Sequence, residues 1–390
     1  MDKYSETDKK ESLHIVVKNR SDLFRASEIL AREKVIGVDL ESDSMFHYKE
    51  KVCLIQISVP DQNILIDTLS IRDLKPLLPV FSDPDIRKVF HGADYDIRSL
   101  FRDFNIEINS LFDTQIAARL LGIAQTSLSY SLESRFGISM EKKYQKSDWS
   151  KRPLSREMLQ YAVKDTYYLI HLARMLEKEL REKERFSWFE EECELLSKVR
   201  PALPKDEPLF FRFKGAAKLD HRSLAVLDEI LKWREDLALR RDIPPFKIIG
   251  NPQIMEIVNT KPIEIGGLDG LSPKQVSILG SSILKKIQIA MEIPENKLPV
   301  FPKEKRQKLS VMVLRKINAL KEWRERHGKK IGLDPSIICP NSLIQAIALM
   351  NPCSPEQLKG LSEIKKWQIN LFGEEICALL TSISHAEKEG

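Results

Sequence analysis

The chain has 390 residues, of which 42% are hydrophobic and 31% are charged, enough apolar material for more than one packed domain. Its first residues are polar, and no run approaches the ~18 apolar residues of a membrane span. Five cysteines are scattered without a Cys-x-x-Cys pair. This pattern argues against a signal peptide, a membrane protein, a disulfide framework and a zinc cage, and it predicts a cytoplasmic protein.

The net charge of +5 is unevenly divided along the chain. Residues 201–390 hold 30 Lys and Arg against 23 Asp and Glu, whereas the first 200 residues hold 32 against 34. A basic half attached to a slightly acidic half suggests that one part meets a polyanion and the other holds a cation.

The first half reads as strands that form a meander and then alternate with helices, which predicts a mixed α/β sheet. A helix at 22–33 is expected to be capped by Ser21, and one long amphipathic helix is expected at 155–180 after a polar loop at 141–154. The expected strands lie at 13–17, 35–41, 52–59, 63–69, 88–90 and 108–112. The other expected helices lie near 74–81, 97–104, 113–121 and 182–199.

The second half contains an internal repeat with an offset of 90 residues. Trp233-Arg234-Glu235 recurs as Trp323-Arg324-Glu325, and two prolines and one glycine (Pro245, Pro262 and Gly270) recur at the same offset. Each copy predicts a small bundle of short helices, which in the first copy are expected at 224–240, 251–259, 262–268 and 277–290. A Pro- and Lys-rich stretch at 294–308 links the copies. The predicted domains are 1–204, 205–297 and 298–390.

Asp39 and Glu41 stand two apart in the strand at 35–41, so both side chains point to one face. Two neighbouring carboxylates repel each other and lose hydration unless a positive charge lies between them. Mg²⁺ and Mn²⁺ supply such a charge and prefer oxygen ligands. Asp-x-Glu is common, so the pair alone also fits a strand end with solvated acids.

Three further acids stand out by their context. Asp96 lies where a strand ends and a helix begins, a place where sites in α/β sheets gather. Asp113 lies in a similar place, and we interpret it as the N-cap of the following helix. Tyr161 and Asp165 are four apart on one helix face. Together they could bind a metal and orient a water, although Tyr161 alone also fits a packing tyrosine.

In this order and spacing, Asp39-x-Glu41, Asp96 and Tyr161-x3-Asp165 resemble the three motifs of the DEDDy exonuclease superfamily. The sister DEDDh group has a histidine five residues before the last Asp, a position that Gln160 occupies here. Flanking stretches narrow the resemblance to the ribonuclease D family; they are Leu54-Ile55-Gln56-Ile57, Phe90-His91-Gly92-Ala93, Phe112-Asp113-Thr114 and Asp148-Trp149-x2-Arg152-Pro153-Leu154. The repeats resemble HRDC modules (helicase and RNase D C-terminal). Leu40 departs from the Thr of many bacterial members.

The resemblance implies an α/β ribonuclease H-like (DEDD exonuclease) domain with a mixed sheet, followed by two small all-α HRDC helical bundles. It implies a monomeric 3′→5′ exoribonuclease that releases nucleoside 5′-monophosphates with two divalent ions, Mg²⁺ or Mn²⁺. On the family pattern Asp39 bridges both ions, Glu41 and Asp165 complete the first, Asp96 holds the second, and Tyr161 orients the attacking water. The implied substrates are tRNA precursors and other structured RNAs with 3′ tails. The alternatives are a DNA exonuclease of the same fold and a non-catalytic nucleic-acid-binding module.

The remaining candidates are weaker. In this family the loop at 141–154 approaches the scissile phosphate or terminal nucleotide, so the substrate candidates are Leu40, Lys142, Lys143 and Gln145. Candidates for RNA-backbone contacts are Lys303, Lys305, Arg306, Lys308, Arg315, Lys316, Lys321 and Lys329. His91 is expected to pack near the site, Trp149, Arg152 and Pro153 to be structural, and Trp233 and Trp323 to be core residues rather than stacking platforms.

Overall fold

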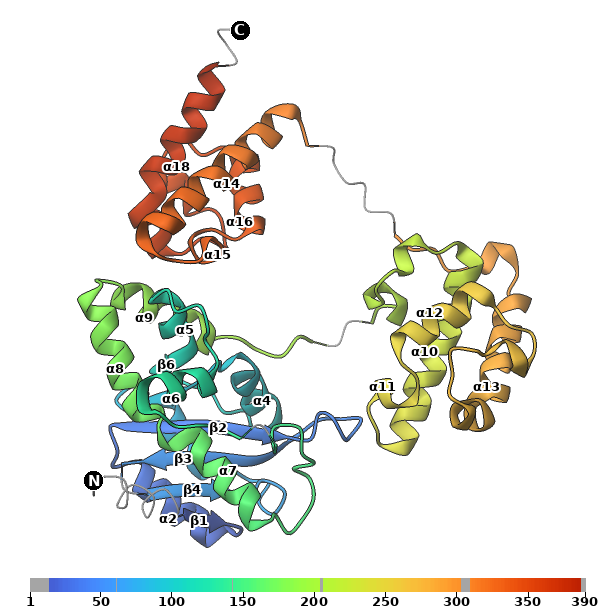
Figure 1. Ribbon diagram of the computed structural model, residues 1–390, viewed down its shortest axis with the longest axis horizontal. Coiled ribbons are helices and arrows are strands. Elements are labelled where there is room, and N and C mark those ends of the chain that lie inside the picture. The colour runs from blue at the N-terminus through green and yellow to red at the C-terminus, as the bar shows by residue number, and fades with distance from the viewer. Residues whose placement is uncertain (1–13, 61, 142, 204–205, 303–308, 387–390) are drawn as a thin grey trace. The chain divides into compact units, whose positions relative to one another are not determined.

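The computed structural model describes residues 14–60, 62–141, 143–203, 206–302 and 309–386 (Figure 1). The chain divides into two compact units. Unit 1 contains residues 1–42, 52–201 and 308–390, and unit 2 contains residues 43–51 and 202–307. No helix in the described part of the chain combines the length and the apolar character that a bilayer crossing requires.

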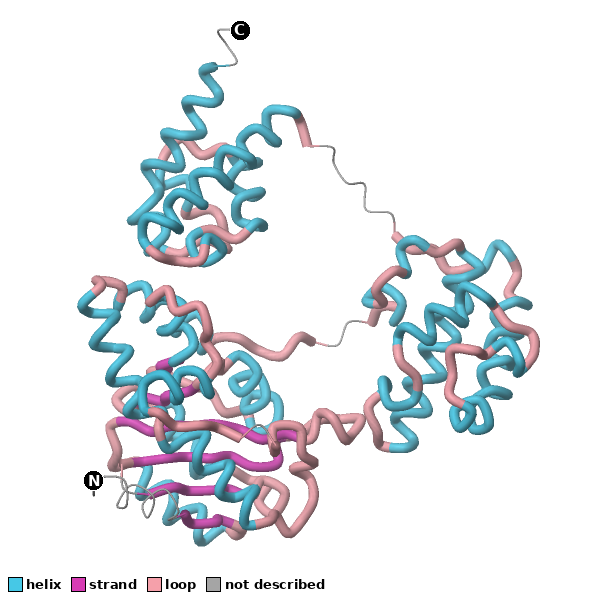
Figure 2. The backbone as a smooth tube through the Cα atoms, viewed as in Figure 1, coloured by secondary structure: helices cyan, strands magenta, loops and turns pink. Residues whose placement is uncertain are grey.

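Unit 1 is built on one six-stranded sheet with the strand order β1-β4-β3-β2-β5-β6 (Figure 2). β2 pairs antiparallel with β3 and parallel with β5, so the sheet is mixed, as the sequence predicts. The strands are β1 (His14–Val17), β2 (Val35–Ser42), β3 (Val52–Val59), β4 (Gln62–Ile66), β5 (Arg87–Phe90) and β6 (Leu111–Asp113). β2 therefore lies in the interior of the sheet, where its backbone is held on both edges.

The two faces of the sheet carry different side chains along β2 and β3. Val38, Leu40, Ile55 and Ile57 point to one face and belong to the large hydrophobic core. Because side chains alternate along a strand, Asp39 and its cross-strand partner point to the other face. That face is covered by α7 (Arg156–Tyr167), which contacts β2, β3 and β4.

The helices of the first 200 residues are close to those predicted. They are α2 (Arg20–Leu30), the 3₁₀ turn η1 (Lys75–Leu77), α3 (Leu78–Ser82), α4 (Asp94–Phe104), α5 (Thr114–Leu120), α6 (Leu128–Phe136), α7, α8 (Leu169–Glu182) and α9 (Phe186–Ser197). The predicted single helix at 155–180 is wrong, because α7 ends and α8 begins around Tyr168. Tyr168 keeps a right-handed conformation (φ −89°, ψ −8°), which requires no glycine. No proline lies at this position either, so the sequence does not mark the break.

Two local predictions are also corrected. The N-cap of α2 is Asn19 rather than Ser21, since the Asn19 side chain accepts a hydrogen bond from the Asp22 N–H at 3.0 Å. The third strand of the meander ends at Ile66, because the Asp67 carboxylate accepts hydrogen bonds from the N–H groups of Leu69 and Ser70 and turns the chain.

Unit 2 is a helical bundle whose core contains Trp233. Its elements are η2 (Leu209–Arg212), η3 (Ala216–Lys218), α10 (His221–Arg241), α11 (Pro245–Ile248), α12 (Asn251–Thr260), η4 (Ile265–Gly267), α13 (Pro273–Glu292) and η5 (Glu295–Lys297). The predicted helix at 262–268 is only the short turn η4, which contains Gly266 and Gly267, two poor helix formers.

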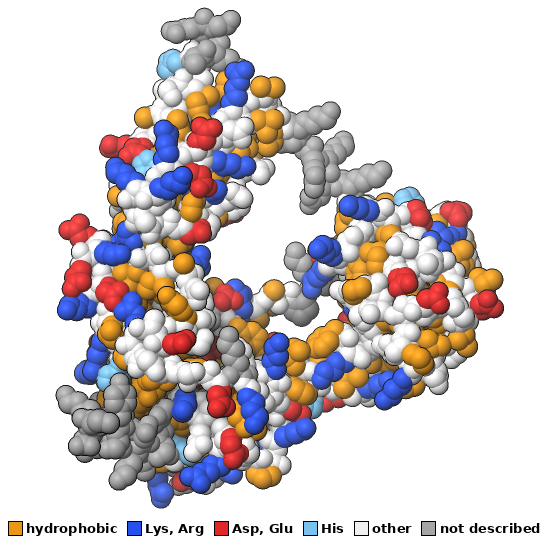
Figure 3. All heavy atoms as spheres, viewed as in Figure 1, with side chains coloured by type: hydrophobic (Ala, Val, Ile, Leu, Met, Phe, Trp, Pro, Cys, Tyr) orange, Lys and Arg blue, Asp and Glu red, His pale blue; other side chains and the backbone are white. Residues whose placement is uncertain are grey.

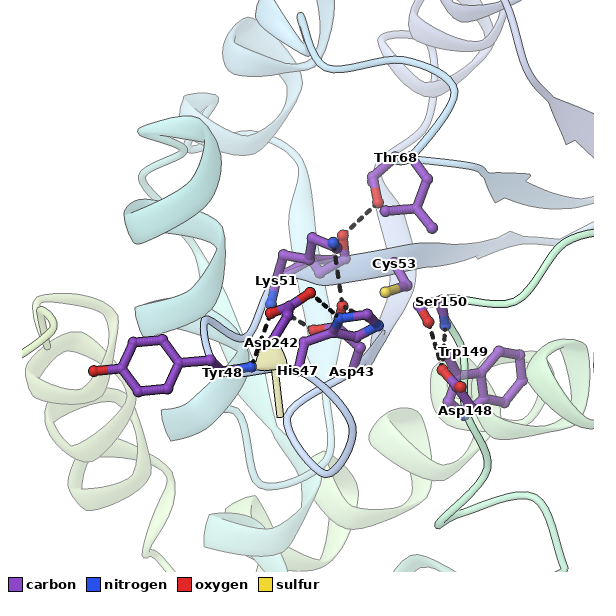
Figure 4. A network of polar contacts seen from close by, with 12 residues as sticks. Asp43, His47, Tyr48, Lys51, Cys53, Thr68, Asp148, Trp149, Ser150 and Asp242 are labelled. Carbon is purple, nitrogen blue, oxygen red and sulfur yellow. Dashed lines mark hydrogen bonds and ion pairs between the residues drawn. The ribbon is translucent and has the colours of Figure 1, made fainter. Parts of the chain in front are cut away.

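Residues 43–51, which connect β2 to β3, belong to unit 2 and contact α10 and the residues after it. His47 Nδ1 and the Asp242 carboxylate are 2.7 Å apart, and the Tyr48 N–H donates to the same carboxylate at 3.2 Å (Figure 4). The Tyr48 hydroxyl donates to Glu235 at 3.0 Å. This segment is therefore held by side chains of the first repeat.

The second bundle lies in unit 1 and repeats the first with the predicted offset. It consists of α14 (Val311–Ile331), α15 (Pro335–Ile338), α16 (Asn341–Met350), α17 (Pro355–Leu358) and α18 (Lys366–Ala386). The repeated Arg makes the same contact in both copies: Arg234 donates to Asn251 at 2.8 Å, and Arg324 donates to Asn341 at 3.0 Å. The repeated Trp is buried in both copies, so its assignment to the core is confirmed.

Within unit 1 the second bundle packs against α9. The rings of Trp188 and Trp367 stack at 4.8 Å between centroids with an interplanar angle of 15°. The Glu191 carboxylate accepts hydrogen bonds from the N–H groups of Lys366 and Trp367 at the start of α18, and Lys365 pairs with Glu192. A carboxylate at a helix N-terminus accepts hydrogen bonds from free N–H groups and interacts favourably with the positive end of the helix dipole.

Candidate active site

β2 carries the first two acids of the site, Asp39 and Glu41, on the face that α7 covers. The approach of α7 depends on Gly37, two residues earlier on the same face. A Cβ at this position would lie 2.9 Å from the carbonyl oxygen of Thr166 and 3.3 Å from the Cβ of Leu169. Glycine therefore lets the end of α7 and the start of α8 lie against the strand.

α7 supplies the third acid. Its N-cap is Ser155, whose side chain accepts from the Met158 N–H. Ligand oxygens of Asp39, Glu41 and Asp165 all lie within 4.8 Å of one another. A strand and a helix separated by more than 100 residues of chain thus bring these acids into one cluster, as the sequence motif predicts.

The fourth acid, Asp96, is buried in the first turn of α4. Its position depends on the loop between β5 and α4, in which Gly92 has a φ of +75°, a conformation that glycine adopts without strain. The Asp113 carboxylate accepts hydrogen bonds from the N–H groups of Gly92 at 3.0 Å and Ala93 at 2.7 Å. Asp113 therefore anchors the loop that presents Asp96.

Asp113 is also the N-cap of α5, as predicted, because it accepts from the N–H groups of Gln115 and Ile116. The sequence reasoning missed its second contact, with the loop before α4. The available signal was Gly92, whose place two residues after the end of a strand favours a tight turn with exposed N–H groups.

The pKa values of all four acids are raised, first by burial and, for three of them, also by neighbouring negative charges. Burial, opposed by a backbone hydrogen bond, raises the pKa of Asp39 from 3.8 to about 7. Burial and then the charges of Asp39, Asp165 and Asp96 raise the pKa of Glu41. Burial and then the charge of Asp39 raise the pKa of both Asp96 and Asp165.

The chain provides no cation for this cluster among its described residues. The ion pairs that these residues form involve other acids, such as Asp67 with Arg152 and Glu179 with Arg135. Buried and half-buried carboxylates with raised pKa values and no basic partner are the donor set that a hard divalent cation neutralises. The residues present therefore fit Mg²⁺ or Mn²⁺.

Tyr161 lies one turn before Asp165 on α7 and interacts with its carboxylate. Burial and then the charges of Asp165, Glu41 and Asp39 raise the pKa of the phenol well above 10, so it remains protonated at neutral pH. Its ring lies 5.8 Å from that of Tyr144 and 6.2 Å from that of Trp149. The phenol can therefore donate a hydrogen bond but cannot act as a base.

The loop before α7 fixes this aromatic group. Trp149 is buried and donates from Nε1 to the Tyr144 carbonyl at 3.3 Å. Arg152 donates to the Asp67 carboxylate at 2.7 and 2.8 Å and to the Cys53 carbonyl at 2.8 Å. Figure 4 shows Trp149 beside Asp148 and Ser150. The structural role predicted for Trp149 and Arg152 is confirmed.

The structure places the other substrate candidates as follows. Lys143 and Gln145 are exposed on the loop before α7, and Lys142 lies outside the described residues. Leu40 is buried in the large core, on the face away from the acids, which leaves its backbone rather than its side chain for a substrate. His91 contacts the Thr114 hydroxyl at 2.8 Å and is absent from the acid cluster, in agreement with the packing role.

The candidates for RNA-backbone contacts divide into three groups. Lys303, Lys305, Arg306 and Lys308 lie outside the described residues. Arg315, Lys321 and Lys329 are exposed on α14. Lys316, on the same helix, is only 6% exposed, so it has little surface to offer a phosphate.

Comparison with known proteins agrees with this site. A 3′-5′ exonuclease family profile matches residues 14–181, and an HRDC domain profile matches residues 223–287 and 314–380. The ribonuclease D of Gluconacetobacter diazotrophicus is 28% identical over 374 residues, which cover 94% of this chain and 92% of that protein.

Two solved structures are similar. The catalytic core of RRP6 from Trypanosoma brucei is 31% identical with a TM-score of 0.63, over 71% of this chain and 79% of that one. RNase D of Escherichia coli is 23% identical and shares the fold, with a TM-score of 0.69 over 95% of this chain and 99% of that one. The predicted fold class is thereby confirmed. The chain belongs to the ribonuclease D family of 3′-5′ exonucleases and carries two HRDC domains.

Proposed function

We propose that this 3′-5′ exonuclease acts on RNA and removes nucleoside 5′-monophosphates from its 3′ end by a two-metal-ion mechanism. The observation that carries this proposal is the cluster of Asp39, Glu41 and Asp165, whose ligand oxygens lie within 4.8 Å beside a protonated Tyr161. Relatives that cover nearly the whole chain bear the name ribonuclease D.

Four carboxylates would hold the two ions. Asp39 would be shared by both, Glu41 and Asp165 would complete the set for one, and Asp96 would hold the other. When bound, two divalent ions neutralise the charge that builds up on the phosphate and on the attacking and leaving oxygens. The raised pKa values of all four groups support this assignment. They mean that the site disfavours unneutralised negative charge, which a bound cation can neutralise in place of protons.

The chain's own groups would orient the reactants. Tyr161 would donate a hydrogen bond to the attacking water, and its aromatic neighbours Tyr144 and Trp149 would keep the phenol in place. Lys143 and Gln145, exposed on the loop just before α7, would contact the phosphate or the last nucleotide. In this scheme no side chain becomes covalently attached to the substrate.

For substrates we propose tRNA precursors and other structured RNAs with 3′ tails, processed in the cytoplasm by a monomeric enzyme. The Escherichia coli relative is described as an exoribonuclease involved in structured RNA processing. The basic segment at 303–308 and the exposed Arg315, Lys321 and Lys329 would supply sequence-independent phosphate contacts. On the face shown in Figure 3, lysine and arginine are interspersed with acidic residues. Free, separated cysteines support the reducing compartment.

Digestion of matched RNA and DNA oligonucleotides, with Mg²⁺ or EDTA, tests this function. The proposal expects Mg²⁺-dependent release of 5′-mononucleotides from the 3′ end of RNA, faster than from DNA of the same sequence. Equal or faster digestion of DNA would favour the DNA exonuclease instead. A protein that binds both and digests neither would be a non-catalytic binding module.

A further inference from the structure

Gln56 is a fully buried side chain in β3 whose amide has no evident purpose in the fold. It is 0% exposed. Neither its Nε2 nor its Oε1 has a hydrogen-bond partner among the residues that the structure describes. Buried amides are nearly always hydrogen-bonded, and an apolar side chain of the same length would fill this position without leaving polar atoms unpaired.

The sheet register places Gln56 directly beside the first acid of the site. Asp39 in β2 and Gln56 in β3 are cross-strand partners. Such partners in an antiparallel pair project from the same face with Cβ atoms about 4.5–5.5 Å apart. Gln56 therefore shares with Asp39 and Glu41 the face that α7 covers.

Its neighbours along β3 locate it further beneath α7. Two residues after it, the Ser58 hydroxyl lies 2.6 Å from the hydroxyl of Thr166, which follows Asp165. Two residues before it, Leu54 packs in a cluster with Ala162 and Val163. Gln56 thus faces the part of α7 that carries Asp165.

We propose that Gln56 is a positioning residue of the metal site, whose Nε2 donates a hydrogen bond to the ionised carboxylate of Asp39 when cations are bound. Carboxylate ligands of metals are themselves usually hydrogen-bonded, and such contacts orient the oxygens that face the ion. A neutral amide suits this role, because a lysine or arginine at the same place would compete with the cation. The inference rests on the proposed function, since it requires that the acid cluster binds a divalent ion.

The test compares Mn²⁺ binding by the full-length wild type with binding by full-length Gln56→Met. In this variant an apolar chain of similar length replaces the amide. Titration followed by electron paramagnetic resonance of free Mn²⁺ measures affinity independently of nuclease activity. The proposal expects about 10- to 100-fold weaker binding, together with a melting temperature in EDTA equal to or above that of the wild type. Leu65→Met controls for repacking and should leave Mn²⁺ affinity unchanged, because Leu65 is buried and pairs with Gln56 from β4, on the side of β3 away from β2.

Gln56→Asn serves as a second variant because it keeps a buried amide but shortens its reach by one methylene, so it should also bind Mn²⁺ more weakly. Wild-type affinity in both variants would overturn the inference and leave the proposed metal site standing. A lower melting temperature of Gln56→Met in EDTA with unchanged Mn²⁺ affinity would show a structural role only and would also overturn it. If the wild type itself bound no Mn²⁺, the proposed metal site would fail and the role of Gln56 with it.

Discussion

Replacing Asp39 with Asn should stabilise the metal-free protein while abolishing its activity. Burial raises the pKa of this carboxyl from 3.8 to about 7, so above pH 7 the folded protein carries an ionised group that its surroundings disfavour. Asparagine has nearly the same shape and no charge. The variant should therefore unfold at a higher temperature than the wild type at pH 8 in EDTA.

The sign follows from proton linkage. A carboxyl whose pKa is raised in the folded state favours folding below its unfolded pKa, here near 3.8, and loses that contribution as the pH rises through about 7. Each pKa unit corresponds to about 1.4 kcal/mol, so the three-unit rise sets an upper limit of about 4 kcal/mol at pH 8. For a unit of this size 1 kcal/mol shifts the melting temperature by about 2–4 °C, so a gain of several degrees is expected.

Thermal unfolding in EDTA at pH 8 and pH 4.5 measures this difference. The gain should be largest at pH 8 and small at pH 4.5, where most copies of the wild-type carboxyl are protonated in the folded protein. Asp67→Asn is the matched control. Burial alone would raise the pKa of Asp67, but hydrogen bonds from Arg152 lower it below its usual value. That change should therefore destabilise the protein at pH 8. A melting temperature of Asp39→Asn at or below wild type at pH 8 would refute the electrostatic reasoning.

Three further predictions concern the same site. Tyr161→Phe should lower the turnover number about 100-fold with little change in the KM for RNA or in melting temperature, measured by steady-state digestion; unchanged turnover would remove the phenol from the mechanism. Asp113→Ala removes the acceptor of four N–H groups, so it should cost about 2 kcal/mol or more in urea unfolding and should weaken Mn²⁺ binding through Asp96; wild-type values for both would contradict this role. Mg²⁺ should raise the melting temperature more at pH 8 than at pH 6, because protons compete for carboxylates of raised pKa; the opposite order would contradict the assigned direction.

Local patterns predict the sheet and the pairs Asp39–Glu41 and Tyr161–Asp165, whereas only the family resemblance predicts that the two pairs come together. Alternation along 35–41 fixes which face Asp39 occupies, and helical spacing places Tyr161 and Asp165 together. The break near Tyr168 and the second role of Asp113 escape prediction because each is set by packing between segments distant in sequence. The sequence shows that Gln56 belongs to a family motif but not what the side chain does. Only the register of β3 with β2 and the unpaired amide of Gln56 show that it faces the acids.

The same distinction applies to the repeats. The offset of 90 residues predicts two similar bundles, and the buried Trp and hydrogen-bonded Arg of each copy follow the pattern. The packing of the second bundle against α9 through Trp188 and Trp367 could not be predicted, because no periodicity within either segment encodes its partner.

We propose that clustered carboxylates make this chain a metal-dependent 3′→5′ exoribonuclease. Time-resolved product analysis on a tRNA with a 3′ extension, with the wild type and Asp165→Asn, tests it most directly. We expect stepwise release of 5′-mononucleotides from the 3′ end by the wild type in Mg²⁺, none in EDTA, and none by Asp165→Asn, which should still bind the RNA. Trimming by Asp165→Asn at the wild-type rate, or by the wild type in EDTA, would rule out the metal-dependent mechanism.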